Sequence, residues 1–86
     1  MQRPWVSSAA YGAAIAFLIR ARTEAGVSQR DLADRLGKHR SFVTKVESRE
    51  RRLDIVEFVA IARALDLEPG PLISALAAEL PDQLDI

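Results

Sequence analysis

The stretch from residue 40 to residue 47, RSFVTKVE, contains side chains whose types and spacing suggest a chemistry. Val43 and Val46 form an apolar seam along one side of a predicted helix. The opposite side carries hydrogen-bond donors of different reach, namely Arg40, Ser41, Thr44 and Lys45. A guanidinium fork matches two acceptors on a guanine edge, and an amphipathic helix with such donors suits the DNA major groove. The pattern therefore indicates recognition of double-stranded DNA.

The rest of the chain offers little for catalysis. His39 is the only histidine, cysteine is absent, and no group of His, Asp and Glu residues has metal-ligand spacing. Ser28, Ser41 and His39 could be arranged as a hydrolase set, but such residues beside helix starts more often serve as caps or phosphate contacts. We expect a binding protein without enzyme activity, metal or cofactor.

Two predicted helices, residues 29–36 and 40–47, position the donors. Ser28 is a good N-cap for the first helix, and Asp31 follows in its first turn. Gly37 can end that helix in a left-handed conformation without steric cost. The second helix starts within a few residues, so the pair is expected to enclose a tight turn.

Three further helices are predicted around this pair. The first begins at an N-cap, Ser7 or Ser8, and runs to about Ala25, where Gly26 ends it. The fourth covers about residues 55–65. Its expected core-facing stripe is Ile55, Phe58, Val59, Ala62 and Leu65.

The fifth helix is expected over about residues 71–80, after a sharp break at Pro69–Gly70–Pro71. Residues 1–7 are predicted to form an irregular arm that Trp5 anchors by packing. Pro81 ends the fifth helix, and residues 82–86 are expected to fray.

Net charge is zero, but the charges are segregated along the chain. Residues 20–52 contain ten Lys and Arg against five Asp and Glu, whereas residues 53–86 contain one Arg against seven acids. The positive charge coincides with the predicted helix pair, as a phosphate-binding surface requires. The acidic half is expected to face away from DNA.

Length and composition predict one all-α domain over residues 1–86. The absence of cysteine suits a reducing cytoplasm. The longest apolar run, residues 13–19, is far too short to span a membrane. We expect a soluble, cytoplasmic protein, bacterial or phage-encoded.

Several residues together resemble the phage repressor/Cro-like (XRE-type) helix-turn-helix family. They are Arg22, Gly26-Val27-Ser28-Gln29, Leu32-Ala33, Gly37, Glu47, Ala62, Leu65 and Leu67. The resemblance covers roughly residues 11–76. It implies a five-helix lambda-repressor-like fold with the helix-turn-helix at the second and third helices.

The resemblance also implies roles for individual residues. Arg40, Ser41 and Lys45 match the family's base-reading positions. Arg22 matches an arginine that pairs, in the family, with the glutamate that closes the third helix, which here is Glu47. Phe42 could touch a thymine methyl or pack against the second helix or the arm. Gln29 matches a glutamine that meets a phosphate and supports the reading helix. The further backbone contacts expected are Lys38, His39, Thr44, Arg49, Arg51 and Arg52.

Three residues depart from the family pattern. Lys38 stands where an apolar residue is usual, His39 replaces a small N-cap, and Arg49 replaces a glycine after the reading helix. These departures leave open the geometry of the turn and the contacts of its residues with the DNA backbone.

The resulting hypothesis is a homodimeric repressor of a palindromic operator, since one such domain reads too few base pairs for genomic specificity. The apolar residues Leu72, Ile73, Leu76 and Leu80 either form the dimer interface or cap the core of one domain. The alternatives are a small activator or controller protein, and an antitoxin-like protein that also binds a partner protein.

Overall fold

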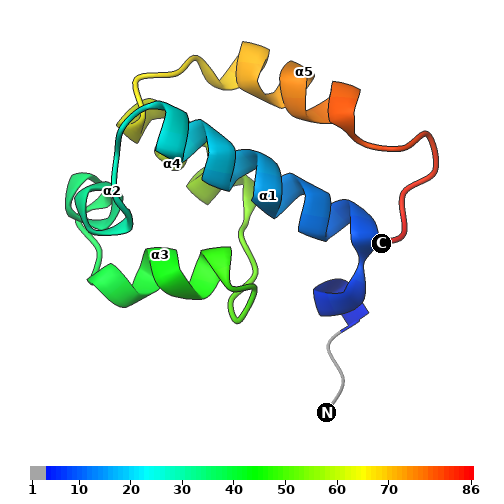
Figure 1. Ribbon diagram of the computed structural model, residues 1–86, viewed down its shortest axis with the longest axis horizontal. Helices are drawn as coiled ribbons and strands as arrows, with labels where there is room; N and C mark the ends of the chain where they lie inside the picture. Colours follow the sequence, from blue (N-terminus) through cyan, green and yellow to red (C-terminus); the bar gives the residue numbers. More distant parts are fainter. Residues whose placement is uncertain (1–3) are drawn as a thin grey trace.

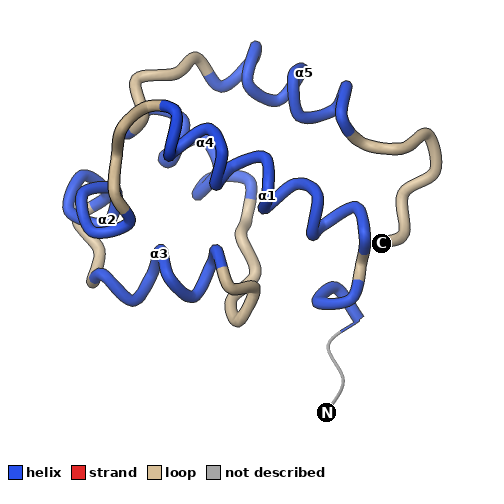
Figure 2. Tube along the Cα trace, in the orientation of Figure 1, coloured by secondary structure: helices blue, strands red, loops and turns tan. Residues whose placement is uncertain are grey.

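The computed structural model describes residues 4–86, and this part of the chain contains helices and loops but no β-strand (Figures 1 and 2). A short 3₁₀ helix, η1 (Pro4–Ser7), is followed by five α-helices. They are α1 (Ala9–Glu24), α2 (Gln29–Leu36), α3 (Arg40–Glu47), α4 (Ile55–Ala64) and α5 (Pro69–Glu79). The predicted all-α, five-helix architecture is confirmed. The irregular arm predicted for residues 1–7 is wrong for residues 4–7, which form η1, and its residues 1–3 lie outside the described part.

The helices are arranged around α1. In Figure 1, α5 runs along the upper side of α1 and α3 along its lower side, with α4 behind and α2 seen end-on. The chain after α5 turns back, so that the C-terminus lies beside the start of α1. Within residues 4–86, none of the helices combines the length and apolar character that a membrane span requires.

Four helices end in the same left-handed turn. The residue with positive φ is Gly26 (73°) after α1, Gly37 (67°) after α2, Arg49 (64°) after α3 and Asp66 (60°) after α4. In each case the next residue donates its N–H to a carbonyl five residues earlier, for example Glu50 to Lys45 at 2.9 Å. Two of these turns use glycine, while the other two place a Cβ in a conformation that L-residues disfavour.

The sharp break predicted at residues 69–71 is wrong. These residues form the first turn of α5 rather than a break before it. The first backbone N–H groups of a helix have no intrahelical acceptor, so Pro69 and Pro71 remove no hydrogen bond there. The first helical bond runs from Leu72 N to Glu68 O at 3.1 Å.

Two groups of buried side chains make up the core. The first joins α1, α3, α4 and α5 through Ile15, Phe17, Leu18, Val46, Ala62, Leu72 and Leu76. The second joins α2, α3 and α4 through Val27, Leu32, Ala33, Val43, Ile61 and Leu65. The predicted stripe of α4 is wrong at its start, because Ile55 lies in the first turn of α4 and is 83% exposed.

The tail also differs from the frayed end predicted. The Asp85 carboxylate accepts hydrogen bonds from the backbone N–H groups of Ala9 (2.8 Å) and Ala10 (3.0 Å). Ser8 caps the same helix by accepting from Tyr11 N, and its hydroxyl donates to the Asp85 carbonyl at 2.6 Å. The tail thus satisfies donors that the start of α1 leaves unpaired, and these bonds lower the pKa of Asp85.

Candidate nucleic-acid interface

Helix α3 presents a polar face to solvent. Val43 and Val46 are buried against the other helices, and Arg40, Thr44 and Lys45 are exposed. Within residues 4–86, neither Arg40 nor Lys45 has an ion-pair partner. Figure 1 places α3 on the side of α1 opposite to α5, where no other helix covers it. The two cations are therefore available to an external anion or acceptor.

The start of α3 shows how His39 replaces a small N-cap. Its Nδ1 accepts a hydrogen bond from the backbone N–H of Ser41 at 3.1 Å and lies 2.9 Å from the Ser41 hydroxyl. His39 has the extended backbone of an N-cap residue. Because Nδ1 accepts, Nε2 carries the ring proton and remains a donor on the exposed side.

A hydrogen-bond network fastens α3 to α1 and α2. Arg22 Nε donates to Glu47 Oε2 at 2.6 Å, and Arg22 Nη2 donates to Glu47 Oε1 at 3.0 Å. Gln29 Nε2 donates to the same Oε1 at 2.8 Å, and Arg22 Nη1 reaches the Val27 carbonyl at 2.8 Å. The side chains of Arg22 and Glu47 are each only 11% exposed. The structure thus contains the ion pair that the resemblance implied, and Gln29 supports the closing glutamate.

Phe42 lies on the packing side of α3. It is half-buried and contacts both groups of core residues. The Arg51 guanidinium lies 4.8 Å from the Phe42 ring centroid, and Lys38 Nζ lies 5.7 Å from it. These contacts favour packing over contact with a thymine methyl.

Arg51 is held within the protein. It donates two hydrogen bonds to Glu57, at 2.8 and 2.7 Å, and a third to the Arg52 carbonyl at 3.0 Å. The hydrogen bonds from Arg51 lower the pKa of Glu57, and those bonds in turn raise the pKa of Arg51. A neutralised, bidentate arginine is a poor candidate for the phosphate contact predicted for Arg51.

Arg49 turns back toward α1 instead of outward. Its Nη1 lies 3.5 Å from the Val6 carbonyl. A Cβ at Gly12 would lie only 2.6 Å from the same Nη1, so glycine in the first turn of α1 makes room for this side chain. The Arg49 guanidinium thus contacts the protein itself, which argues against the predicted phosphate contact.

Arg52 has a different environment from the other two arginines of the loop. It is exposed, and its guanidinium lies 5.8 Å from the ring centroids of both Trp5 and Tyr11. No carboxylate within residues 4–86 forms an ion pair with it. Trp5 packs edge-on against Tyr11 with centroids 5.3 Å apart, and the Tyr11 hydroxyl accepts from Leu53 N at 3.1 Å.

The apolar residues of α5 do not form one surface. Leu72 and Leu76 are only 9% and 7% exposed and pack in the core, so they are not accessible to a partner and the predicted interface is wrong for them. Leu80 is half-buried, whereas Ile73 is 48% exposed. Ile73 lines an open groove of about 480 Å³ between α1, α4 and α5. Ile55 also lines the groove, and Val56 beside it is 72% exposed.

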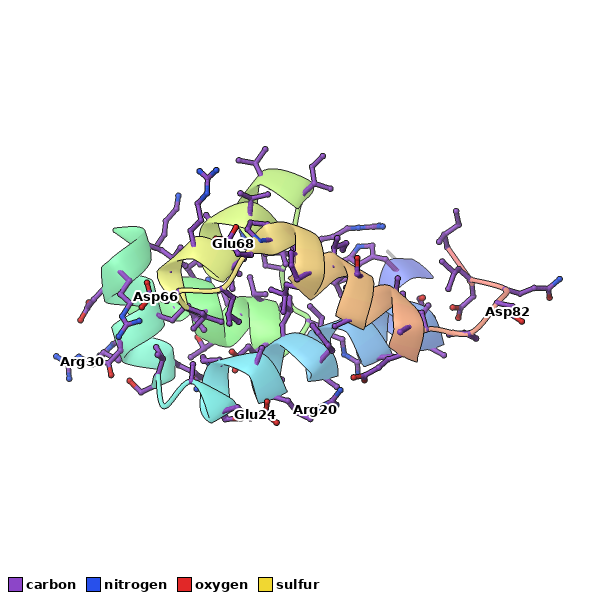
Figure 3. All side chains as sticks on the ribbon, turned by 90° about the horizontal axis from the view of Figure 1, so that it is seen from above. Arg20, Glu24, Arg30, Asp66, Glu68 and Asp82 are labelled. Carbon is purple, nitrogen blue, oxygen red and sulfur yellow. The ribbon has the colours of Figure 1, made fainter. Side chains whose placement is uncertain are left out.

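Several acidic residues lie on the α5 side of the molecule, opposite α3. Figure 3 views the molecule from above in Figure 1, with α5 toward the viewer, and shows Asp66 and Glu68 on the α4–α5 loop and Asp82 on the tail. Arg20 and Glu24 project from the outer edge of α1 in this view, and Arg20 pairs with Glu79 of α5. The charge segregation along the chain is therefore only partly reproduced in space, because Glu57 of the acidic half pairs with Arg51 of the α3–α4 loop.

Several contacts that shape the region around α3 could not be predicted from the sequence. The aromatic pair Trp5 and Tyr11 meets Arg52 only after folding, since more than forty positions separate Tyr11 from Arg52. Arg35 donates to the Ala64 carbonyl at 2.8 Å and ties α2 to the end of α4. Arg30, an exposed cation of α2, is different, because its position directly after Gln29 is a signal in the sequence.

Comparison with known proteins assigns this architecture to a family. A helix-turn-helix family model matches residues 18–72, well over half of the chain. An XRE-family like protein from Pseudomonas syringae pv. tomato str. DC3000 has 45% sequence identity and a TM-score of 0.78, over 85% of this chain and 89% of that one. No curated protein sequence matches.

Two other solved structures are similar. The restriction-modification controller protein C.AhdI from Aeromonas hydrophila has 38% identity and a TM-score of 0.62, over 70% of this chain and 91% of that one. The clp gene regulator ClgR from C. glutamicum has 20% identity and a TM-score of 0.69, over 83% of this chain and 92% of that one, and it shares the fold. The chain belongs to the XRE-type helix-turn-helix family of DNA-binding transcriptional regulators, which is not an enzyme family.

Proposed function

We propose that this protein is a homodimeric repressor that binds a palindromic operator through α3. The main support is the exposed face of α3, where Arg40 and Lys45 are held over a rigid support but have no ion-pair partner within residues 4–86. Bidentate arginine contacts to guanine are the commonest specific contacts in the major groove. Lys45 reaches a second base, and Ser41 adds a short contact.

Fewer residues are proposed to contact the DNA backbone than the sequence predicted. Lys38, the Nε2 of His39 and Arg52 are exposed donors around α3, and Thr44 lies beside them on its outer face. Gln29 is the first residue of α2, where backbone N–H groups also favour the binding of a phosphate. Arg49 and Arg51 are left out, because their guanidinium groups contact the protein itself.

The proposed dimer interface combines the first turn of α4 with the exposed part of α5. Ile55, Val56 and Ile73 are large apolar side chains exposed next to an apolar groove. A two-fold interface uses one surface twice, so a surface with both a protrusion and a hollow can be self-complementary. Half-sites of such a dimer are expected about 10–10.5 bp apart, centre to centre.

The controller hypothesis remains the second candidate function. It is favoured by the 38% identity to a restriction-modification controller protein. A reporter gene placed downstream of the selected operator distinguishes the two. Repression supports the first candidate, and activation the second.

Operator selection from random DNA tests the assignment of Arg40. Arg40→Ala should cost about 1–3 kcal/mol at the selected site and relax the preference at one base pair in each half-site. Arg63→Ala, which removes an exposed arginine of α4, is the matched control and should leave the preference unchanged. An unchanged sequence preference in the Arg40 variant would refute its role in base reading.

Sedimentation tests the interface. Ile73→Asp should give folded monomers that bind the operator weakly, because the charge would be desolvated only in the dimer. Leu76→Asp is the contrasting variant and should impair folding itself, since Leu76 is buried in the monomer. An Ile73 variant that associates as tightly as the wild type would place the interface elsewhere.

A further inference from the structure

The loop between α3 and α4 is joined to the N-terminal part of the chain by side-chain contacts. Arg49 lies over Gly12 and reaches the Val6 carbonyl at 3.5 Å, and the Tyr11 hydroxyl accepts from Leu53 N at 3.1 Å. Arg52 lies 5.8 Å from the ring centroids of both Trp5 and Tyr11. We name this assembly, made of η1, the first turn of α1 and residues 49–53, the loop bracket.

The three arginines of the loop bracket have different surroundings. Glu57 neutralises Arg51, and Arg49 is half-buried against α1. Arg52 is exposed, and its charge is not balanced by a carboxylate within residues 4–86. Its contacts are with the faces or edges of two aromatic rings, which leave the N–H groups of the guanidinium able to donate elsewhere.

We infer that Trp5 is a positioning residue that orients Arg52 toward a DNA phosphate. An exposed arginine on a loop normally samples many rotamers, and fixing it costs side-chain entropy when DNA binds. Contact with two rings restricts the guanidinium before binding, so less of that cost falls on association. Trp5 thereby contributes to affinity through Arg52 without itself contacting DNA. This inference depends on the proposed function.

A double-mutant cycle of Trp5→Ala and Arg52→Ala tests the inference through DNA affinity over a salt series. Cation–π contacts at exposed sites imply that Trp5→Ala weakens binding by about two- to fivefold. Arg52→Ala should reduce the slope of log K against log salt by about 0.9 for each phosphate that residue 52 no longer neutralises. Trp5→Ala should reduce the same slope in part, and should have no further effect once Arg52 is alanine.

Two additional measurements separate positioning from folding. Trp5→Phe keeps an aromatic ring and should restore affinity to within about twofold of the wild type. Thermal melts should show that all the variants stay folded at the binding temperature. The inference would be overturned if Trp5→Ala weakened DNA binding equally in the wild type and in the Arg52→Ala background. It would also be overturned if Trp5→Phe did not restore affinity, or if either alanine variant bound DNA as tightly as the wild type.

The failure of this inference is distinguishable from failure of the proposed function. If the wild-type chain selects no operator, the proposed function itself fails. If the wild type selects an operator and Arg40→Ala changes the preference, but the Trp5–Arg52 cycle shows no coupling, only the positioning role of Trp5 is wrong.

Discussion

Gly12 and Arg49 should be energetically coupled although 37 positions separate them. Gly12 ends the first turn of α1 and donates a helical hydrogen bond to Ser8 O, and alanine at such a helical position would normally be more stable by about 0.5–1 kcal/mol. In this protein a Cβ at Gly12 would lie 2.6 Å from Arg49 Nη1, well inside van der Waals contact. Gly12→Ala must therefore displace the guanidinium.

The displacement has a cost that opposes the gain in helix propensity. Arg49 would lose its packing on α1 and its hydrogen bond to Val6, which at 3.5 Å is at the weak end of the usual range of about 0.5–1.5 kcal/mol. The two effects nearly cancel, so Gly12→Ala should change the stability of the wild type little. In an Arg49→Ala background no guanidinium remains to be displaced, and Gly12→Ala should stabilise by about 0.5–1 kcal/mol.

Urea denaturation of the four chains measures this coupling through midpoints at a common m-value. Gly70→Ala is a matched control, since a Cβ at Gly70 in α5 would meet nothing within 4 Å. Its effect should be the same in the wild type and in the Arg49→Ala background. Additivity of Gly12→Ala and Arg49→Ala within about 0.3 kcal/mol would refute the proposed packing of Arg49 on α1.

Three further outcomes are expected. Arg49→Gly should be more stable than Arg49→Ala by up to about 1 kcal/mol in urea denaturation, because only the alanine keeps a Cβ at φ 64°; equal stability would argue against strain. Glu47→Ala should destabilise by about 3–5 kcal/mol in the same assay, since it leaves Arg22 buried without its carboxylate; a loss under about 1 kcal/mol would contradict this. Hydrogen bonds from the start of α1 lower the pKa of Asp85, so its stabilisation is present above the unfolded pKa of about 3.9 and is lost as pH falls through the folded value. The gap in melting temperature between wild type and Asp85→Asn should therefore close in acid, and a gap independent of pH would exclude this linkage.

Local signals explain why the bounds of α2 and α3 could be predicted from the sequence. Ser28 caps α2 by accepting from Asp31 N at 3.0 Å, and Gly37 adopts the left-handed turn that ends it. The apolar spacing of Val43 and Val46 then fixes which face of α3 is buried. Each signal acts within one turn of the chain, so no knowledge of the tertiary structure was needed.

Burial on α4 and α5 could not be predicted in the same way. Apolar spacing identifies a stripe, but only the neighbouring helices decide how much of that stripe is covered. Ile55 belongs to the stripe of α4 and is nevertheless exposed, whereas Ile61, outside that stripe, is buried. On α5, Leu76 is buried and Ile73 lies at the edge of the groove for the same reason.

The arginines of residues 49–52 show a second limit of sequence reasoning. Composition predicts the same role for the three side chains, because all are cations that directly follow α3. Their partners lie far away or on another element: Val6 for Arg49, Glu57 for Arg51, and the aromatic pair for Arg52. Only the folded structure separates an arginine that supports the domain from one that is free to bind.

The same distinction explains how a chain with no net charge can present a DNA-binding surface. Of the ten cations in residues 20–52, Arg20, Arg22 and Arg51 form ion pairs, Arg35 bonds the end of α4, and Arg49 packs on α1. Five cations remain without a hydrogen-bond or ion-pair partner within residues 4–86, namely Arg30, Lys38, Arg40, Lys45 and Arg52. All five belong to α2, α3 or the loops that flank α3, while Asp66, Glu68 and Asp82 lie on the α5 side. Because exposed charges act mainly within about one Debye length, roughly 8–10 Å, the surface around α3 is governed by these nearby cations more than by the net charge.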